Sequence, residues 1–176
     1  MTKLGEAEPT GTTNIEASLS INGEILRYVR PSDTDAGIVN GSAFERKPKD
    51  VDGVSVTRAN YYSVDDDTDI ECVRTVIGSN LNLAKTGLFA RLPCDGVREI
   101  GTIVEAVLDV LAAPTQGTDF DPLCDLGKKP DPGFANDAHA IISGLPFAGS
   151  DEGTLASELA GDLLCRTITK TYGISA

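Results

Sequence analysis

The chain contains no tryptophan, and aromatic residues make up only 5% of its 176 residues. Its core must therefore be built mainly from Val, Ile, Leu and Ala. Apolar residues make up 40% and charged residues 24%, a balance typical of a folded globular protein and too apolar for wholesale disorder. At this length one core is expected. The sequence predicts a single globular domain over residues 16–176, preceded by a flexible N-terminal tail, residues 1–15, that shows no periodicity.

Long hydrophobic runs are missing as well. No run approaches the roughly 18 apolar residues that a membrane span requires. Residues 1–6 also lack the basic and then apolar order of a signal peptide. The sequence therefore predicts a soluble protein with no membrane association and a cytoplasmic location.

Metal-binding side chains are few. The only histidine is His139, and the four cysteines, Cys72, Cys94, Cys124 and Cys165, form no Cys-x-x-Cys pair. A closed zinc site needs four nearby nitrogen or sulfur ligands, which this spacing disfavours. Without an export signal, we expect the cysteines to be reduced and partly buried.

Positive charge is scarce. The chain has 15 Lys and Arg against 27 Asp and Glu, and residues 95–165 alone hold 13 acidic and three basic residues. The formal net charge of -12 repels phosphate backbones and anionic lipids, so we expect no nucleic-acid partner. The acidic surface is interpreted as a solvated face that keeps the protein soluble. Attraction to a basic partner protein, or mimicry of nucleic acid, is the alternative.

The common catalytic and cofactor motifs are also absent. The chain has no Gly-x-x-x-x-Gly-Lys, Gly-x-Gly-x-x-Gly or Gly-x-Ser-x-Gly sequence. The acidic triplet at residues 65–67 does not begin an EF-hand loop, because position twelve is Val76 instead of Glu. A nucleophile paired with His139 stays open, since nothing in the spacing selects Cys94 or Cys124. We therefore expect no cofactor and no metal.

The first third of the chain favours strands. Residues 17–21 and 24–29 alternate around Asn22-Gly23, which predicts a β-hairpin because a type I′ turn needs positive φ at both central residues. Short strands are also expected at residues 39–44 and 54–57, on either side of a segment rich in Lys, Pro and Asp.

Helices follow these strands, which favours an α+β fold: a mostly antiparallel sheet packed against two principal helices. A shorter helix is expected over residues 68–77, with Gly78 as its stop. The first principal helix is predicted between Asp95 and Pro114, and the second over residues 150–171. Their apolar stripes are Ile100, Ile103, Val104, Val107, Leu108 and Leu111 in the first, and Leu155, Leu159, Leu163 and Ile168 in the second. Further strands are expected at residues 86–92 and 139–144, separated by a long loop at residues 115–137.

The stretch from Leu26 to Arg58 departs most from the average charge. It nets +1, whereas the rest of the chain nets -13. Arginine among apolar residues on a strand either reaches water or meets an anion, and its guanidinium group matches phosphate and carboxylate geometry. The candidate ligand-binding residues are Arg27, Arg30, Ser42, Ser55, Arg58 and His139. The alternative is that the arginines pair with Asp33, Asp35 and Asp52 on the surface and that His139 is satisfied at a strand end.

Four short motifs carry a resemblance. They are Leu26-Arg27-Tyr28-Val29-Arg30-Pro31, Gly41-Ser42-Ala43-Phe44, Val54-Ser55-Val56-Thr57-Arg58 and Asn136-Asp137-Ala138-His139-Ala140. Over residues 24–145 the chain resembles small uncharacterised bacterial proteins, a resemblance that implies no known activity. Arginine on one early strand followed by serine on another also resembles the order in ADP-ribosyltransferase-type enzymes, where those residues bind NAD. Only His139 is a candidate for the third element of that pattern.

Three functions follow as hypotheses. The first is a small binding or accessory protein that engages a partner protein or a small anionic ligand through the Arg, Ser and His surface. The second is a nucleotide-handling enzyme of ADP-ribosyltransferase-like type. In it, Arg30 and Arg58 hold phosphates, Ser55 contacts ribose or phosphate, and His139 acts as general acid or base. The third is an acidic inhibitor or immunity-type protein that blocks a basic site.

Overall fold

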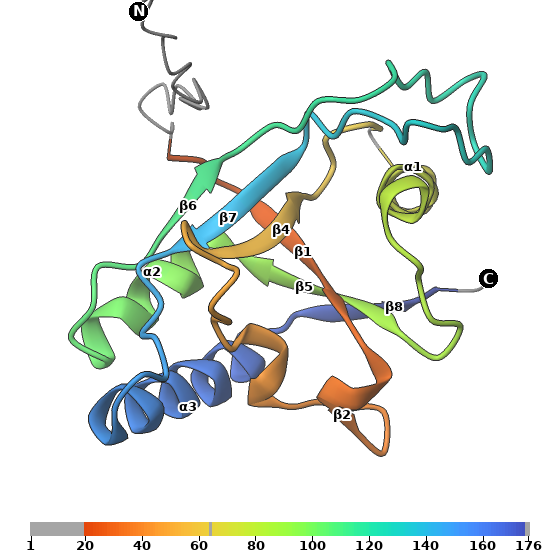
Figure 1. Cartoon of the computed structure of the whole chain (residues 1–176). Helices are drawn as coiled ribbons and strands as arrows, with labels where there is room; N and C mark the ends of the chain where they lie inside the picture. Colours follow the sequence, from red (N-terminus) through yellow and green to blue (C-terminus); the bar gives the residue numbers. More distant parts are fainter. Residues whose placement is uncertain (1–19, 64, 175–176) are drawn as a thin grey trace, which may run out of the picture.

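A six-stranded antiparallel sheet runs through the centre of the molecule (Figure 1), as described by a computed structural model for residues 20–63 and 65–174. The strand order is β6-β7-β4-β1-β5-β8, and a separate two-stranded sheet is formed by β2 and β3. The predicted α+β class is confirmed, while the predicted tail at residues 1–15 lies outside the described residues. The strands are β1 (Glu24–Val29), β2 (Thr34–Asp35), β3 (Ile38–Val39), β4 (Val54–Arg58), β5 (Leu88–Pro93), β6 (Asp109–Ala112), β7 (His139–Ser143) and β8 (Lys170–Gly173).

Helices cover both faces of this sheet (Figure 1). The α-helices are α1 (Asp66–Asn80), α2 (Cys94–Ile103) and α3 (Asp151–Arg166), and two 3-10 helices are η1 (Pro31–Asp33) and η2 (Gly41–Phe44). The larger apolar cluster lies between the sheet and α2, α3 and η2, and it includes Ile25, Phe44 and Leu164. A smaller cluster, which includes Leu26 and Phe89, lies between the sheet and α1. None of the helices in the described residues has the length and apolar composition that crossing a membrane requires.

The predicted hairpin across Asn22-Gly23 is wrong. Both edges of β1 are occupied by partners distant in sequence, β4 on one side and β5 on the other. The chain before Asn22 therefore pairs elsewhere: the Ile21 N–H donates to the Val110 carbonyl at 2.9 Å, and Ser20 forms a bridge with Leu111. Gly23 has a positive φ of 90°, but Asn22 does not, so the type I′ turn does not form. The local signal also could not show that β1 is a central strand.

The long helix predicted between Asp95 and Pro114 is wrong beyond Ile103. The chain reverses at Glu105, which has a φ of 54°, and the next residues form β6, which pairs with β7. The run from Val107 to Ala112 fits both the helical and the strand period, and pairing with β7 buries Val110 completely. Val107, assigned to the helical stripe, is 90% exposed.

Two further assignments change. Residues 39–44 were expected to form one strand, but only Ile38–Val39 is extended, and the 3-10 helix η2 places Ser42 in a tight turn. The last helix ends at Arg166 because the chain then forms β8 beside β5. Leu155 and Leu159 of its predicted stripe are exposed, because α3 packs through small residues and Leu164; its buried residues are Ser157, Ala160, Gly161 and Leu164.

Several assignments agree with the structure. The strands β4, β5 and β7 lie where alternation placed them, and α1 covers the predicted helix, with Asp65 as its N-cap. Gly78 does not stop α1, which continues to Asn80. The segment between β6 and β7 has no helix or strand of its own. The four cysteines are free, with Cys72 and Cys94 buried.

Arg91 ties α1 to the edge of the sheet. Its Nη1 lies 2.8 and 2.9 Å from the two carboxylate oxygens of Asp66, and it donates to the Tyr172 hydroxyl at 2.8 Å. Lys170 Nζ is 3.4 Å from the same carboxylate. Because Tyr172 and Lys170 belong to β8, the ionised form of Asp66 holds this last strand against α1.

The stability of this edge is expected to depend on pH. The hydrogen bond from Arg91 lowers the pKa of Asp66 below its ordinary 3.8. Asp66 therefore stabilises the fold above pH 3.8, and this contribution is lost as the pH falls through the lower pKa of the folded state. Asp66→Asn should lower the melting temperature at neutral pH, and the difference from wild type should shrink in acid. A difference that stays constant with pH in thermal denaturation would contradict this role.

Candidate functional site

A cleft opens where β1 and β4 separate. The two strands pair at only two positions, Ile25 with Arg58 and Leu26 with Thr57, and they then run apart (Figure 1). The space between them is a cavity of about 430 Å³. Three strands, β1, β4 and β7, contribute to its walls, together with α1 and the long segment before β7. Neighbouring central strands that diverge in this way leave backbone groups that other donors must satisfy.

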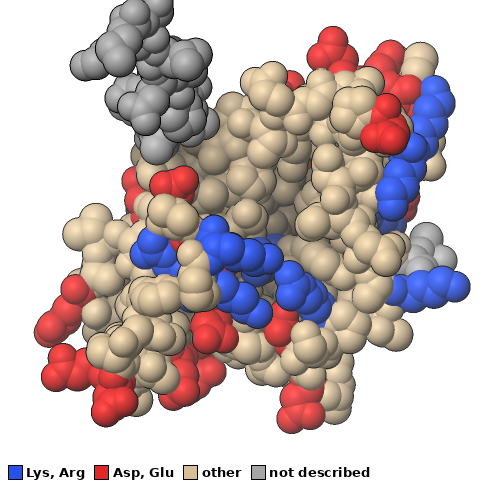
Figure 2. Space-filling view, viewed as in Figure 1, with Lys and Arg blue, Asp and Glu red and all other residues tan. Residues whose placement is uncertain are grey.

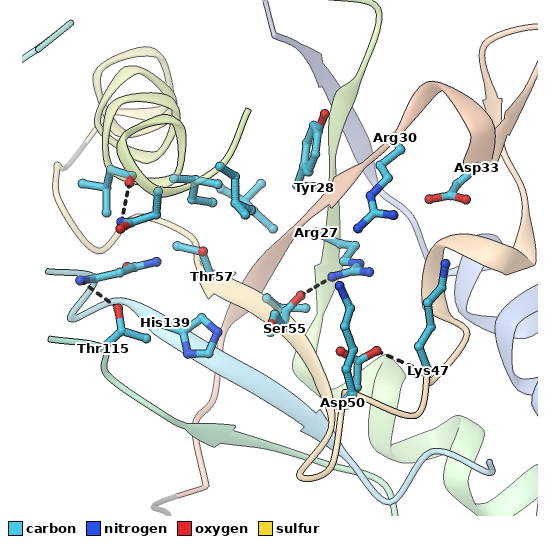
Figure 3. Close-up of a pocket in the computed structure, with 18 of the residues that line it drawn as sticks. Arg27, Tyr28, Arg30, Asp33, Lys47, Asp50, Ser55, Thr57, Thr115 and His139 are labelled. Atoms are coloured by element: carbon cyan, nitrogen blue, oxygen red, sulfur yellow. Dashed lines mark hydrogen bonds between the residues drawn. The ribbon is translucent and has the colours of Figure 1, made fainter. Parts of the chain in front are cut away.

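Cationic side chains gather at one end of this cleft. Figure 2 shows a band of Lys and Arg beside a hollow in the middle of this face, with Asp and Glu mainly toward its periphery. In Figure 3, Arg27 and Arg30 lie close to Lys47 at this end of the cavity. Four cations against two carboxylates give this end a formal surplus of two positive charges; they are Arg27, Arg30, Lys47, Lys49, Asp33 and Asp50.

Arg27 occupies the gap between the separating strands. Its Nη1 donates to the Ser55 carbonyl at 2.7 Å, and its Nε donates to the Ala43 carbonyl at 2.9 Å. The guanidinium group thus joins β1 to β4 and η2 in place of a backbone ladder. Burial lowers the pKa of Arg27, while the nearby Asp50 and Asp33 carboxylates act in the opposite direction. The ordinary pKa of arginine is so high that the group stays charged.

The other cations of the cleft are less constrained. Arg30, Lys47 and Lys49 take part in no salt bridge among residues 20–63 and 65–174. Arg30 follows the end of β1 and is exposed, and the two lysines belong to a turn closed by a hydrogen bond from the Lys47 N–H to Asp50 at 3.0 Å. These three charged groups are available to a ligand.

Two serines border the same cavity in different ways. The Ser42 hydroxyl lies 2.6 Å from the Asn40 side-chain oxygen and 3.1 Å from Asp33, so it is already engaged in the cap of η2. Ser55 is exposed on β4 and contributes its carbonyl to Arg27. Of these two serines, only Ser55 has a hydroxyl without a hydrogen-bond partner among the described residues.

The opposite end of the cleft is uncharged. Figure 3 shows Thr57, Thr115 and His139 grouped there, away from the arginines. Amide side chains join them, and apolar residues of β1 and α1 line the wall between the two ends. The amides are Asn80, Gln116 and Asn136, and the apolar residues are Leu26, Val76, Ile77 and Leu81.

His139 lines this end, and its surroundings define which ring nitrogen carries the proton. It lies opposite Thr57 in the β4–β7 pair, and its Nδ1 is 2.5 Å from the Ala113 carbonyl oxygen. A carbonyl only accepts, so Nδ1 carries the proton. Burial lowers the pKa of His139 below its usual 6.5, which keeps the imidazole neutral at neutral pH. Nε2 therefore has a free lone pair and is a hydrogen-bond acceptor.

Arg58, the sixth candidate, does not line the cleft. Its Nη2 donates to the Asp137 carbonyl at 3.0 Å, and its guanidinium carbon lies 4.6 Å from the centre of the Tyr61 ring. Ser55 and Thr57 share one face of β4, and alternation directs Arg58 to the other. The structure thus brings together Arg27, Arg30, Ser42, Ser55 and His139 and leaves Arg58 outside.

Several lining residues were missing from the candidate set. The sequence did contain a signal for Lys47 and Lys49, since both belong to residues 26–58, which carry a net charge of +1. The sequence contained no signal for Gln116 and Asn80, because neutral amides in a loop and at a helix end are ordinary.

Comparisons of the chain with protein-family models, with curated proteins and with solved structures find no match.

Proposed function

We propose that this protein binds a small anionic ligand in the cleft between β1 and β4. The observation that carries the proposal is the convergence of four cationic side chains on one cavity in a chain of net charge -12. Like charges placed together repel, so such a cluster costs stability unless a counter-charge occupies it. The two carboxylates of the cleft offset only half of it.

The geometry favours phosphate or carboxylate groups. Arg30 has donors in a planar fork that matches either group with two parallel hydrogen bonds. Lys47 and Lys49 add mobile point charges on flexible stems. The Ser55 hydroxyl supplies a neutral donor beside them. Together these groups can surround an oxyanion that enters from solvent.

The size of the cleft favours a small molecule over a partner protein. A volume of about 430 Å³ lies within the range of ordinary ligand pockets. The walls combine apolar side chains with a few polar groups, as such pockets do. A flat protein interface needs no cavity of this depth.

A nucleotide-handling enzyme is the second candidate. One observation favours it: Arg30, Ser55 and His139 line the same cavity. The neutral His139 imidazole, with Nε2 unprotonated, suits a general base. Arg58, which was expected to hold a phosphate in this enzyme, lies outside the cleft and is no longer part of the proposed site.

The test is anion titration by calorimetry at low salt, with inorganic phosphate and pyrophosphate as probes. We expect Arg30→Met and Lys47→Met each to weaken binding about tenfold, because each removes one charge-assisted contact of about 1.5 kcal/mol. Their melting temperatures should stay close to wild type, since neither side chain forms a salt bridge in the described residues.

Lys129→Met is the matched control. Lys129 is exposed and lies outside the cleft, so its loss changes the net charge equally. Its affinity for both probes should equal that of wild type, apart from a small long-range effect. Equal weakening in all three variants, or no binding of either anion to wild type, would overturn the proposed function.

A further inference from the structure

The Asn136 side chain holds an unpaired donor in the cleft. Asn136 is 6% exposed, and its side-chain oxygen accepts a hydrogen bond from the Tyr62 hydroxyl at 3.0 Å. Its amide nitrogen has no partner among residues 20–63 and 65–174. This nitrogen is not one of the fully buried polar atoms that lack a partner, so it keeps access to the solvent of the cavity. Because Asn136 lines the cavity, a ligand can supply the missing acceptor.

Tyr62 fixes the orientation of this amide. Burial raises the pKa of Tyr62, so its hydroxyl keeps its proton and donates. The Tyr62 N–H donates to Asp69 at 3.0 Å, and Asp69 also accepts from the Asn60 N–H at 2.8 Å. Asp69 is 2% exposed and belongs to the first turn of α1. The direction of the Asn136 amide is thus set by a buried chain of hydrogen bonds that starts in α1.

An acceptor accompanies this donor. The His139 N–H donates to the Asn136 carbonyl at 3.1 Å, so the two residues form one turn at the start of β7. With Nδ1 bound to Ala113, the free lone pair of His139 is on Nε2. The uncharged end therefore offers one donor and one acceptor, neither of them ionised.

We infer that this end recognises a planar heterocycle with a donor and an acceptor on neighbouring atoms, and that the ligand is a nucleoside monophosphate. The inference rests on the proposed anion site, which would hold the phosphate. In an amide or amidine edge, the acceptor of the ligand would bind the Asn136 amide nitrogen and its donor would bind His139 Nε2. Every common nucleobase carries such an edge. The apolar side chains of Leu26, Val76 and Ile77 supply contacts for the faces of the ring.

The spacing of the two ends fits this ligand. Arg27 is bound at Ser55, whereas His139 lies opposite Thr57. Two residues along a strand correspond to roughly 7 Å, and β7 lies one further strand spacing, about 5 Å, to the side. A nucleotide extends over such an interval from its phosphate to the edge of its base, so one molecule can reach both ends.

The experiment is calorimetric titration of the whole chain with the 5′-monophosphates of adenosine, guanosine, cytidine and uridine, with ribose 5-phosphate and with inorganic phosphate. At least one nucleoside monophosphate should bind about thirtyfold more tightly than ribose 5-phosphate, as two hydrogen bonds of about 1 kcal/mol each predict. His139→Asn retains a donor toward Ala113 and lacks Nε2. Tyr62→Phe releases the Asn136 amide. Each variant should reduce the preference to a few-fold while the affinity for ribose 5-phosphate is unchanged.

Arg30→Met serves as the converse control, because it should weaken every phosphate ligand equally and leave the preference intact. Equal affinity of wild type for ribose 5-phosphate and all four nucleotides would overturn the inference and leave the anion site standing. A preference that both variants retain would also overturn it, since the base would then be bound elsewhere. Failure of every phosphate compound to bind would instead refute the proposed function itself.

Discussion

Arg27→Met is expected to lower the free energy of unfolding by about 2 kcal/mol, far more than Arg30→Met, which should change it by less than about 0.5 kcal/mol. The reason is that Arg27 replaces the missing part of the β1–β4 ladder. Its guanidinium group satisfies the carbonyls of Ser55 and Ala43, whereas Arg30 has no such partner in the described residues. Urea denaturation of both variants measures the difference.

Two opposing effects decide this value. Removing this partly buried cation relieves its desolvation, which is the largest influence on the Arg27 pKa, and methionine fills much of the same volume. Against this, two carbonyl oxygens lose a charged donor, which is worth about 1.5–3 kcal/mol for each bond. The cleft admits water to these oxygens, so only part of that loss remains. The hydrogen bonds should still prevail because water cannot hold two strands and η2 together.

Arg27→Lys separates the charge from the geometry. Lysine keeps the positive charge but cannot extend a planar fork to two carbonyls at once. It should therefore retain much of the anion affinity and recover only part of the stability. If Arg27→Met were as stable as Arg30→Met, the bridging role of Arg27 would be refuted, and Arg27 would be a ligand contact only.

The helices and strands that the sequence predicted well are those whose apolar residues fit only one type of secondary structure. The strands β4, β5 and β7 are short apolar runs rich in Val, Ile, Leu and Phe, and α1 has both an acidic first turn and a capping aspartate at Asp65. In these segments the local preference and the tertiary contacts agree. The α+β class followed from their order along the chain.

Other elements depend on contacts that no local pattern contains. The segment that became β6 fits a helix and a strand equally well, and only the free edge of β7 decides between them. Asn22-Gly23 has the composition of a hairpin turn, but β1 finds both of its partners far along the sequence. The cleft itself results from strand divergence, which alternation of residues cannot show.

The candidate site was predicted from residue type more successfully than from position. Arginine and serine in a positively charged stretch were the candidates, and five of the six candidates line one cavity. The sequence alone already indicated that Ser55 and Arg58 do not share a face, because they lie three residues apart on one strand. The same rule does not separate Arg27 from Arg30, since β1 ends at Val29. The orientation of Asn136 was beyond prediction because it depends on Tyr62 and Asp69.

Gly161→Ala is expected to destabilise the protein by about 3 kcal/mol, at the upper end of overpacking effects. Gly161 lies on α3 where this helix crosses η2. A Cβ atom there would stand 2.5 Å from the Gly41 carbonyl oxygen and 3.0 Å from the Gly41 Cα. Both are backbone atoms, so relief requires that α3 and η2 move apart. Urea denaturation measures the loss.

Gly78→Ala is the matched control, because it makes the same chemical change in another helix, in the last turn of α1. Its added Cβ would meet only the Leu83 side chain, whose Cδ1 and Cγ lie at an ordinary 3.5 and 3.9 Å. Alanine favours the helix over glycine by about 0.5–1 kcal/mol, so this variant should be more stable than wild type. Equal stability of the two variants would show that α3 and η2 tolerate separation.

Gly161→Ala should also change ligand binding in the cleft. η2 carries Ser42, which lines the cavity, and Ala43, whose carbonyl holds Arg27. If α3 pushes η2 outward, Arg27 loses one of its two anchors, and we expect phosphate affinity to fall by several-fold in the folded Gly161→Ala protein. Gly78→Ala should bind phosphate as wild type does, although Gly78 is closer in sequence to the cleft residues Val76, Ile77 and Asn80. That contrast would show that the position of Arg27, set from the opposite face of the sheet, controls the anion site.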